Sequence, residues 1–158
     1  MICGVMFKKV LVAYDGSDHA KHALEYAVDV ADIRKATLYI LTVVPRVTLP
    51  IFPDEGFGAA PITAAQDLGE YQDRMKEMYK KALDEAIKCI KEEFPDLKFE
   101  TILIEGRPSA TIVDQAEKND VDLIVMGSRG LGGIYGWILG STSRRVVDSC
   151  TKPVLIVK

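Results

Sequence analysis

The chain has 158 residues, of which 48% are apolar and 27% charged, with a formal net charge of -3. This composition is typical of one ordinary soluble globular domain, and the net acidity excludes a protein that wraps nucleic acid by charge alone. The three cysteines stand at unrelated spacings with no C-x-x-C pair, which predicts a reduced, cytoplasmic protein. No stretch has the length of a membrane helix, and the N-terminus lacks the charge order of a signal peptide. We therefore expect no contact with membranes.

The chain begins with a pattern of strand, tight turn and helix. Residues 8–14 (KKVLVAY) form a nearly continuous apolar run, as in a strand buried on both faces. Asp15, Gly16 and Ser17 then combine a turn signal with a helix cap. From Asp18 onward the apolar residues recur at helical spacing: Ala20, Ala23, Leu24, Ala27, Val28 and Ala31.

The second unit contains a long, unusual connection. Residues 36–44 (ATLYILTVV) predict another strand, and residues 45–61 hold four prolines and two glycines, which predicts a long loop or lid. A helix is expected over residues 64–94, ended by Pro95. Its predicted buried stripe consists of Leu68, Tyr71, Met75, Met78, Ala82, Ala86 and Ile90.

The third and fourth strands are predicted over residues 97–105 and 121–126. Between them, residues 106–109 read as a turn with Ser109 as a helix cap, and residues 110–118 as a helix. A glycine-rich loop, a short helix over residues 141–149 and a last strand, which begins at Val154 and ends at Lys158, complete the chain.

Five strands alternating with four helical segments predict a doubly wound, Rossmann-like α/β fold. The strands should be parallel, with helices on both faces of the sheet, so that the domain is a three-layer sandwich. We find no internal repeat and expect one domain over residues 1–158. Such sheets bind ligands beyond the carboxyl ends of their strands, which directs attention to the segments after residues 14, 43 and 126.

The segment after the fourth strand has the chemistry of a phosphate site. Residues 127–140 (GSRGLGGIYGWILG) contain six glycines, and Ser141, Thr142 and Ser143 follow at the start of a helix. Glycines allow backbone N–H groups to approach an anion, and a helix N-terminus adds further free N–H groups. An alternative is that the glycines only turn the loop and Ser141 only caps the helix. The charged residues between Asp122 and Asp148 are all arginines: Arg129, Arg144 and Arg145.

The chain resembles the ATP-binding branch of the universal stress protein family. The resemblance rests on the spacing Gly127-x2-Gly130-x9-Gly140-Ser141, on the start KKVLVAYDGSDHAKHALEYAV and on the end TKPVLIVK. The resemblance extends over the whole chain except residues 45–61. It implies a five-stranded parallel sheet in the order 3-2-1-4-5 that holds ATP with Mg²⁺ or Mn²⁺. It also implies a nucleotide-dependent switch or sensor in the stress response, with at most slow ATP hydrolysis.

The resemblance assigns residues to parts of the nucleotide. Asp15 would lie near the ribose or phosphates and is the one candidate metal ligand, while the backbone at Val43 would meet the adenine edge. Arg129 stands where relatives often have His, which would strengthen phosphate binding, and the apolar segment 131–139 would cover the nucleotide or contact a partner. The complete implied ATP site is Ala13, Tyr14, Asp15, Val43, Met126, Gly127, Arg129, Gly130, Gly140, Ser141, Thr142 and Ser143.

Two other classes of function stay open. His19 and His22 have the H-x-x-H spacing that a nucleotidyl-transferring or ATP-hydrolysing enzyme of a related fold could use, although both fall off the apolar helix face and are expected in solvent. Without a positioned base, efficient hydrolysis has no visible agent. Alternatively, the protein is an interaction module without nucleotide. Asp15 itself could merely cap the following helix.

The last strand also predicts an assembly. As the fifth in the order 3-2-1-4-5, residues 154–158 would form an exposed apolar edge, which is an aggregation hazard unless it is paired. The resemblance implies antiparallel pairing with the same strand of a second copy, and thus a homodimer. A downstream protein partner is expected but not identified by the sequence.

Overall fold

The structure is a computed structural model that describes residues 7–48, 62–131 and 139–158. The expectations for the apolar segment, apart from its two end residues, and for the Pro- and Gly-rich loop beyond residue 48 lie outside the described residues. No helix in the described part of the chain is both long enough and apolar enough to cross a membrane.

A five-stranded parallel sheet forms the centre of the fold, in the order β3-β2-β1-β4-β5. This confirms the predicted fold class and strand order. Because β1 lies between β2 and β4, the chain reverses its direction of winding beside β1, which is where such sheets open a crevice. The strands are β1 (Lys9–Ala13), β2 (Thr37–Pro45), β3 (Phe99–Gly106), β4 (Leu123–Gly127) and β5 (Val154–Val157).

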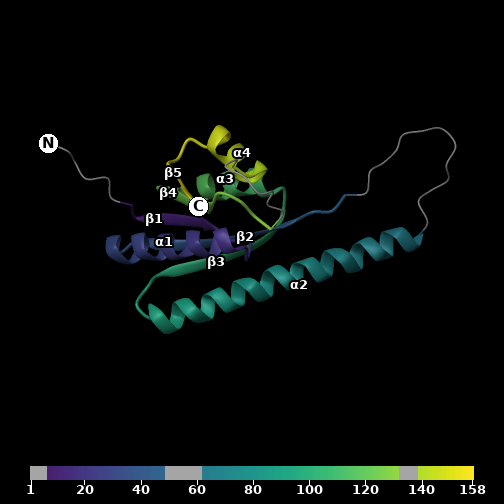
Figure 1. The fold of residues 1–158 in the computed structure, drawn as a ribbon, viewed down its shortest axis with the longest axis horizontal. Coiled ribbons are helices and arrows are strands. Elements are labelled where there is room, and N and C mark those ends of the chain that lie inside the picture. The colour runs from purple at the N-terminus through teal and green to yellow at the C-terminus, as the bar shows by residue number, and fades with distance from the viewer. Residues whose placement is uncertain (1–6, 49–61, 132–138) are drawn as a thin grey trace.

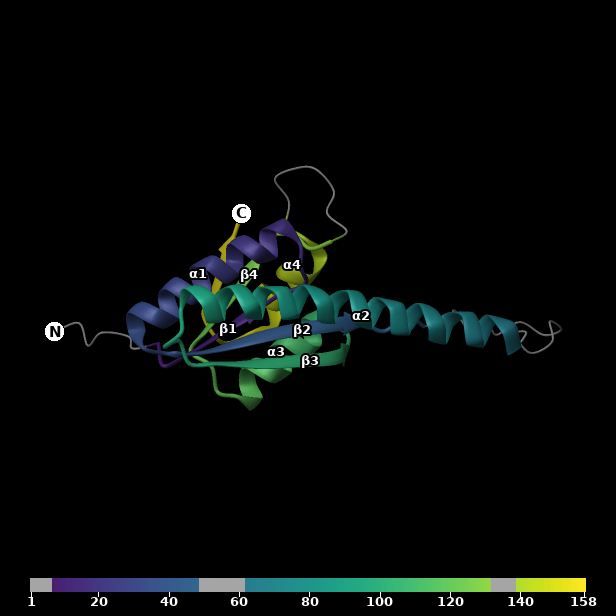
Figure 2. The same ribbon diagram turned by 90° about the horizontal axis from the view of Figure 1, so that it is seen from below.

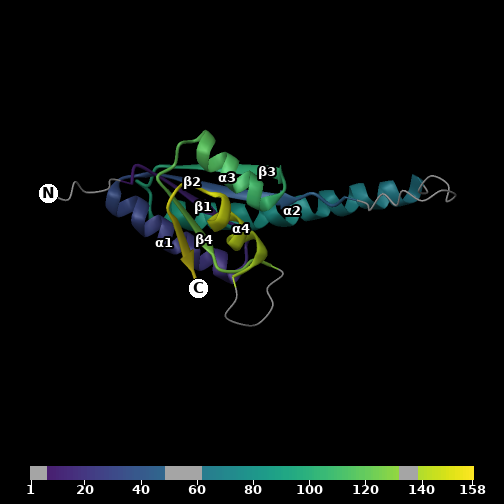
Figure 3. The same cartoon turned by 90° about the horizontal axis from the view of Figure 1, so that it is seen from above.

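Helices cover both faces of the sheet. They are α1 (Asp18–Arg34), α2 (Ile62–Glu93), α3 (Pro108–Lys118) and α4 (Ser141–Ser149). One face carries α1 and α2 (Figure 2), and the other carries α3 and α4 (Figure 3). The long helix α2 crosses under the sheet and its N-terminal part continues beyond it (Figure 1).

Each face of the sheet has its own apolar core, as expected for strands buried on both sides. Val10 and Val12 point toward α1 and α2, whereas Leu11 points toward α3 and α4. This alternation follows from the two-residue period of a strand. The continuous apolar run in β1 is therefore explained by a strand that is buried on both faces.

The first turn forms as its sequence predicted. The Ser17 hydroxyl caps α1 by accepting a hydrogen bond from the Ala20 N–H at 3.2 Å. Gly16 adopts φ +82°, and a Cβ there would lie 2.9 Å from the Cβ of Ala82 in α2. The position therefore requires glycine both for its left-handed backbone and for the close approach of α2.

Two predictions about helices are wrong. Arg107, not Ser109, is the N-cap residue of α3, because Pro108 with its fixed φ starts the helix; Ser109 is buried inside it. In α2, Tyr71 and Met78 were expected in the core but are about half exposed. Ala86 and Ile90 are buried as predicted, but Tyr79 and Leu83 are buried in place of Met78 and Ala82. The N-terminal part of α2 extends past the sheet that would bury it (Figure 1). The buried residues are Tyr79, Leu83, Ala86 and Ile90.

Candidate functional site

A cavity of about 500 Å³ opens at the carboxyl ends of β1, β2 and β4. All twelve residues that the sequence assigned to a nucleotide site line it, although they come from four separate parts of the chain. The structure thus brings together the predicted residues, from Ala13 to Ser143. Leu131 and Leu139, the end residues of the apolar segment expected to cover the nucleotide or contact a partner, also line it. The lining residues that the sequence did not indicate are Ala20, Leu41, Pro45, Tyr79, Pro108 and Ile112.

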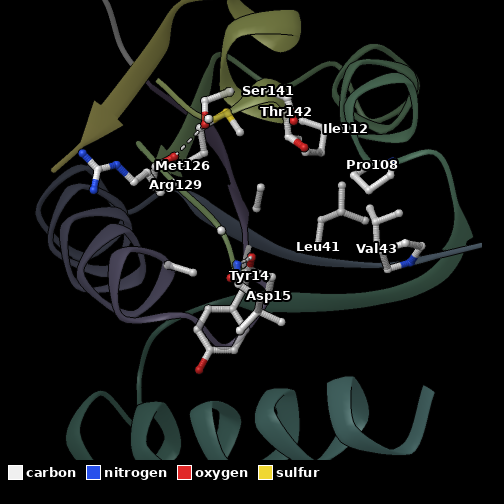
Figure 4. A pocket seen from close by; sticks show the side chains of 18 of the residues that line it. Tyr14, Asp15, Leu41, Val43, Pro108, Ile112, Met126, Arg129, Ser141 and Thr142 are labelled. Atoms are coloured by element: carbon white, nitrogen blue, oxygen red, sulfur yellow. Dashed lines mark hydrogen bonds between the residues drawn. The ribbon is translucent and has the colours of Figure 1, made fainter. Parts of the chain in front are cut away.

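One side of the cavity is apolar. Val43 and Leu41 project from β2 and face Ile112 and Pro108 of α3 (Figure 4). Val43 and Ile112 belong to the core cluster between the sheet and α3, so this wall is an extension of the core. Such a slot suits a flat, weakly polar group. The alternation of β2 places Val43 on this face, but only the tertiary packing could show which α3 residues oppose it.

Asp15 connects the end of β1 to the glycine-rich loop. One carboxylate oxygen accepts a hydrogen bond from the Ser17 N–H at 2.9 Å, and the other accepts one from the Leu131 N–H at 3.2 Å. Asp15 therefore shapes the turn before α1, while Ser17 is the residue that caps the helix. The alternative in which Asp15 serves as the cap is wrong.

Two glycines let the loop after β4 approach its neighbours closely. A Cβ on Gly127 would lie 2.8 Å from the backbone carbonyl carbon of His19 in α1, and a Cβ on Gly130 would lie 2.6 Å from Oδ2 of Asp15. Neither position has room for a side chain without movement. The spacing of these two glycines therefore reflects the close contacts that they make with α1 and with Asp15.

The N-terminus of α4 faces the other side of the cavity. Its N-cap is Gly140, which has no side chain to satisfy the first N–H groups of the helix, so Ser141 is not a cap as one alternative supposed. The Gly140 N–H donates to the Ser128 carbonyl at 2.8 Å and fixes the loop to the helix. Ser141 is exposed and Thr142 half-buried, and both line the cavity. This end of the cavity has the free N–H groups and the dipole that favour an anion.

Ser143 has a structural task in the same helix. Its buried hydroxyl lies 3.0 Å from the carbonyl oxygen of Gly127 and 3.3 Å from that of Ser128, and donates to them. Because the hydroxyl proton is used in this way, Ser143 holds the loop against α4.

Arg129 leaves the loop on the outer side of the cavity. Its side chain extends away from Val43 and Ile112, toward the side of α1 (Figure 4). The Nε atom is buried and has no hydrogen-bond partner among the described residues. The guanidinium therefore brings positive charge to the end of the site that is remote from the apolar wall.

Two tyrosines stand on the α2 side of the cavity. Burial raises the pKa of the Tyr14 hydroxyl, and the negative charges of Asp15 and Glu85 raise that pKa further. Burial also raises the pKa of Tyr79, again with a contribution from Asp15. Both side chains are consequently neutral phenols near pH 7 and can donate a hydrogen bond.

The histidines do not form part of the cavity. Neither His19 nor His22 is among the lining residues, and His22 is exposed as predicted. His19 is different from the prediction, since it is only partly exposed and its Nδ1 atom is buried without a partner among the described residues. The backbone and Cβ of His19 lie directly against Gly127 at the end of β4.

The described residues provide no ready-made metal cage. No group of three or more His, Cys, Asp or Glu side chains within them could hold a metal ion. Asp15 is the one carboxylate among the described residues that line the cavity, and both of its oxygens already accept a backbone hydrogen bond. A cation at this site would therefore need most of its oxygen ligands from a bound molecule.

The fold and cavity define an open α/β protein with a crevice at its switch point, and comparison with known proteins identifies its family. The sequence profile of the universal stress protein family matches residues 6–158. Over 153 residues the chain is 36% identical to universal stress protein YxiE of Bacillus subtilis, which covers 97% of this chain and 100% of YxiE. The chain belongs to the universal stress protein family, as its motifs predicted.

Solved structures of the same family share the fold. Universal stress protein UspA from Lactobacillus plantarum matches with a TM-score of 0.80 and 27% identity, covering 98% of this chain and 100% of UspA. A universal stress protein solved in complex with cAMP matches with a TM-score of 0.56 and 25% identity, covering 96% of this chain and 97% of its own. That relative binds an adenine nucleotide.

Proposed function

We propose that the cavity binds ATP and that the protein acts as a nucleotide-dependent switch or sensor in the stress response. The observation that carries this proposal is the arrangement of one cavity with an apolar wall at Val43 and Ile112 and an anion-favouring wall at Gly140 and Ser141. A nucleotide has an apolar base at one end and phosphates at the other. The family relative in complex with cAMP adds support for an adenine nucleotide.

In this proposal, different residues of the cavity contact different parts of the nucleotide. The base lies between Val43 and Ile112, where the backbone of β2 can meet its polar edge. The phosphates lie against the N–H groups at the start of α4, beside the hydroxyls of Ser141 and Thr142. Arg129 contributes positive charge at that end, where it can approach the outermost phosphate.

Mg²⁺ or Mn²⁺ fits this site as a companion of the phosphates. When bound, such an ion neutralises phosphate charge, and among the described lining residues Asp15 is the one carboxylate that could add an oxygen ligand. Hydrolysis should be slow, with turnover well below about 1 per second, because Asp15 is the one candidate general base among the lining residues that the structure describes. The alternative enzyme that uses His19 or His22 gains no support, since neither lines the cavity.

Calorimetric titration with ATP and Mg²⁺ tests the proposal. We expect saturable binding to the wild type and a loss of about fivefold to tenfold in affinity for Ser141→Ala, because one hydroxyl contact to a charged oxygen is removed. The matched control is Ser149→Ala at the opposite end of α4, where the hydroxyl bonds the Arg145 carbonyl. Gly140→Val should bind still more weakly, since its Cβ would lie 3.3 Å from the Ser128 carbonyl. Equal affinity in all four proteins would refute this site.

We also propose a cytoplasmic homodimer formed by antiparallel pairing of β5 with its copy. Support comes from the sheet order, which places β5 at an edge, and from Leu155, whose side chain is 37% exposed there. Light scattering during size-exclusion chromatography should give twice the chain mass. Leu155→Lys should favour the monomer, whereas Ile33→Lys, at an exposed position of α1, should leave the oligomeric state unchanged. A wild-type monomer at micromolar concentration would refute the proposal.

A further inference from the structure

Tyr79 is a lining residue of unusual origin, because it comes from α2 rather than from a loop after a strand. It is only 7% exposed, yet it belongs to neither apolar core cluster, although the other buried residues of α2 belong to one of them. Leu83, Ala86 and Ile90 of the same helix face all join the core cluster. Tyr79 therefore occupies the boundary between the core and the cavity.

The hydroxyl of Tyr79 lacks a partner within the described part of the chain, where no hydrogen bond involves it. The oxygen is also not one of the buried polar atoms that lack a partner, so the hydroxyl keeps some exposure although the ring is buried. Tyr14 is also buried beside the cavity, but it belongs to the core cluster, and its ring points toward α2 (Figure 4). Of the two tyrosines, Tyr79 is the one placed outside the core with a hydroxyl available to a ligand.

Helix α2 is fixed on both sides of Tyr79, so the position of this side chain is set before a ligand arrives. The amide of Gln72 donates to the Pro45 carbonyl at 3.2 Å and accepts from the Val47 N–H at 3.2 Å. One turn later, Lys76 pairs with Glu105 at 3.0 Å. Beyond Tyr79, Ala82 packs against Gly16. A donor that is held in this way loses little freedom on binding.

The charge around Tyr79 selects the part of a nucleotide that it can meet. The Asp15 carboxylate influences Tyr79 electrostatically, and its negative charge disfavours at this place a phosphate that is not neutralised by a cation. The anion-favouring groups lie instead at Gly140 and Ser141, and the apolar wall lies at Val43. What remains between these two ends is the sugar, whose hydroxyls can both donate to a carboxylate and accept from a phenol.

We propose that the Tyr79 hydroxyl, beside Asp15, donates a hydrogen bond to a ribose hydroxyl of the bound nucleotide and thereby makes the site select ribonucleotides over deoxyribonucleotides. This inference rests on the proposed nucleotide function. A site that is built to hydrogen-bond a hydroxyl rejects the analogue that lacks it, because its own polar groups then stay unpaired. Tyr79 is thus a specificity-determining residue contributed by a helix outside the glycine motif.

The test compares three ligands with two proteins. ATP, 2′-deoxy-ATP and 3′-deoxy-ATP are titrated in the presence of Mg²⁺ into the wild type and Tyr79→Phe. We expect the wild type to bind ATP about tenfold more tightly than one of the deoxy analogues. Tyr79→Phe should bind ATP about tenfold more weakly and should lose most of the discrimination against that same analogue. The matched control is Tyr71→Phe, on the same helix at a half-exposed position outside the cavity lining.

The outcomes separate the two proposals. If the wild type binds ATP but Tyr79→Phe retains its affinity and its ratio between ATP and both analogues, the role of Tyr79 is refuted and the nucleotide site stands. If the wild type does not discriminate between ATP and either analogue, the role of Tyr79 is likewise refuted, and this arm does not depend on the folding of a variant. If the wild type binds none of the three ligands, the nucleotide function itself is refuted.

Discussion

The Asp15 carboxylate accepts a hydrogen bond from the Leu131 N–H at 3.2 Å, across 116 residues of sequence. The same side chain accepts from the Ser17 N–H two residues along the chain. Asp15 therefore joins the turn that starts α1 to the loop that precedes α4. Its conformation is fixed by two backbone groups, so that the cavity has a preorganised polar point between its apolar and its anion-favouring walls.

Replacing Asp15 separates these two connections. Asp15→Asn keeps an oxygen for the Ser17 N–H, but its amide nitrogen cannot accept from Leu131. We expect faster hydrogen exchange at the Leu131 amide, with little change in the free energy of unfolding because that contact is exposed. Asp15→Ala should also lower the free energy of unfolding by about 1 kcal/mol through the Ser17 bond. Unchanged exchange at Leu131 in Asp15→Asn would contradict the connection.

Gly127 and Gly130 should respond differently to alanine. At Gly127 the new Cβ would meet the backbone of His19 at 2.8 Å, which cannot move without shifting α1. We expect Gly127→Ala to lower the free energy of unfolding by about 1–3 kcal/mol, measured by urea denaturation. At Gly130 the obstacle is Oδ2 of Asp15, whose displacement gives up the exposed bond from the Leu131 N–H but moves no backbone, so Gly130→Ala should cost less than about 0.5 kcal/mol. Equal losses would refute the distinction between these contacts.

The success of the sequence in predicting the strands and turns has a local physical basis. The runs of β1, β2 and β4 are apolar on both sides because helices cover both faces of the parallel sheet, and Ser17 caps α1 through a bond to a residue beside it. The predicted site residues were likewise marked by a glycine spacing that reflects close backbone approach at Gly127 and Gly130. Features of this kind are encoded within short segments.

The errors and omissions concern contacts between distant segments. The sequence of α2 carries two apolar stripes side by side, and only the position of the sheet decides that Tyr79 is buried while Met78 is exposed. Ile112 is a core residue that also lines the cavity. Only the packing of α3 against β2, which joins distant segments, shows this second role. His19 was expected in solvent because its helix pattern is polar there, but Gly127 packs on its backbone. No local pattern contains that information.

Ser143 offers a test of the link between the loop and α4. Ser143→Ala removes a buried hydroxyl that donates to the carbonyls of Gly127 and Ser128. We expect a loss of about 1 kcal/mol in the free energy of unfolding, measured by urea denaturation. Ser149→Ala is the control, because its hydroxyl bonds an exposed carbonyl of the same helix and should change stability by less than about 0.5 kcal/mol. A larger effect at Ser149 than at Ser143 would contradict this account.

The buried tyrosines predict a loss of stability at alkaline pH. Burial, aided by Asp15, raises the pKa of Tyr14 in the folded state above its unfolded value of about 10. The folded state therefore holds the phenolic proton more tightly than the unfolded state. The stability that depends on the neutral phenol is fully present below about pH 10 and is lost as the pH rises through the higher folded pKa. Urea denaturation of the wild type should consequently show a lower free energy of unfolding at about pH 11 than at pH 8.

Two variants test whether the tyrosines cause this decrease. Tyr14→Phe, which has no phenolic proton to lose at this position, should show a smaller decrease over the same interval. Adding Tyr79→Phe should make the decrease smaller again, because burial raises the pKa of Tyr79 as well. If the wild type and both variants lost the same free energy between the two pH values, the buried phenols would not be the cause.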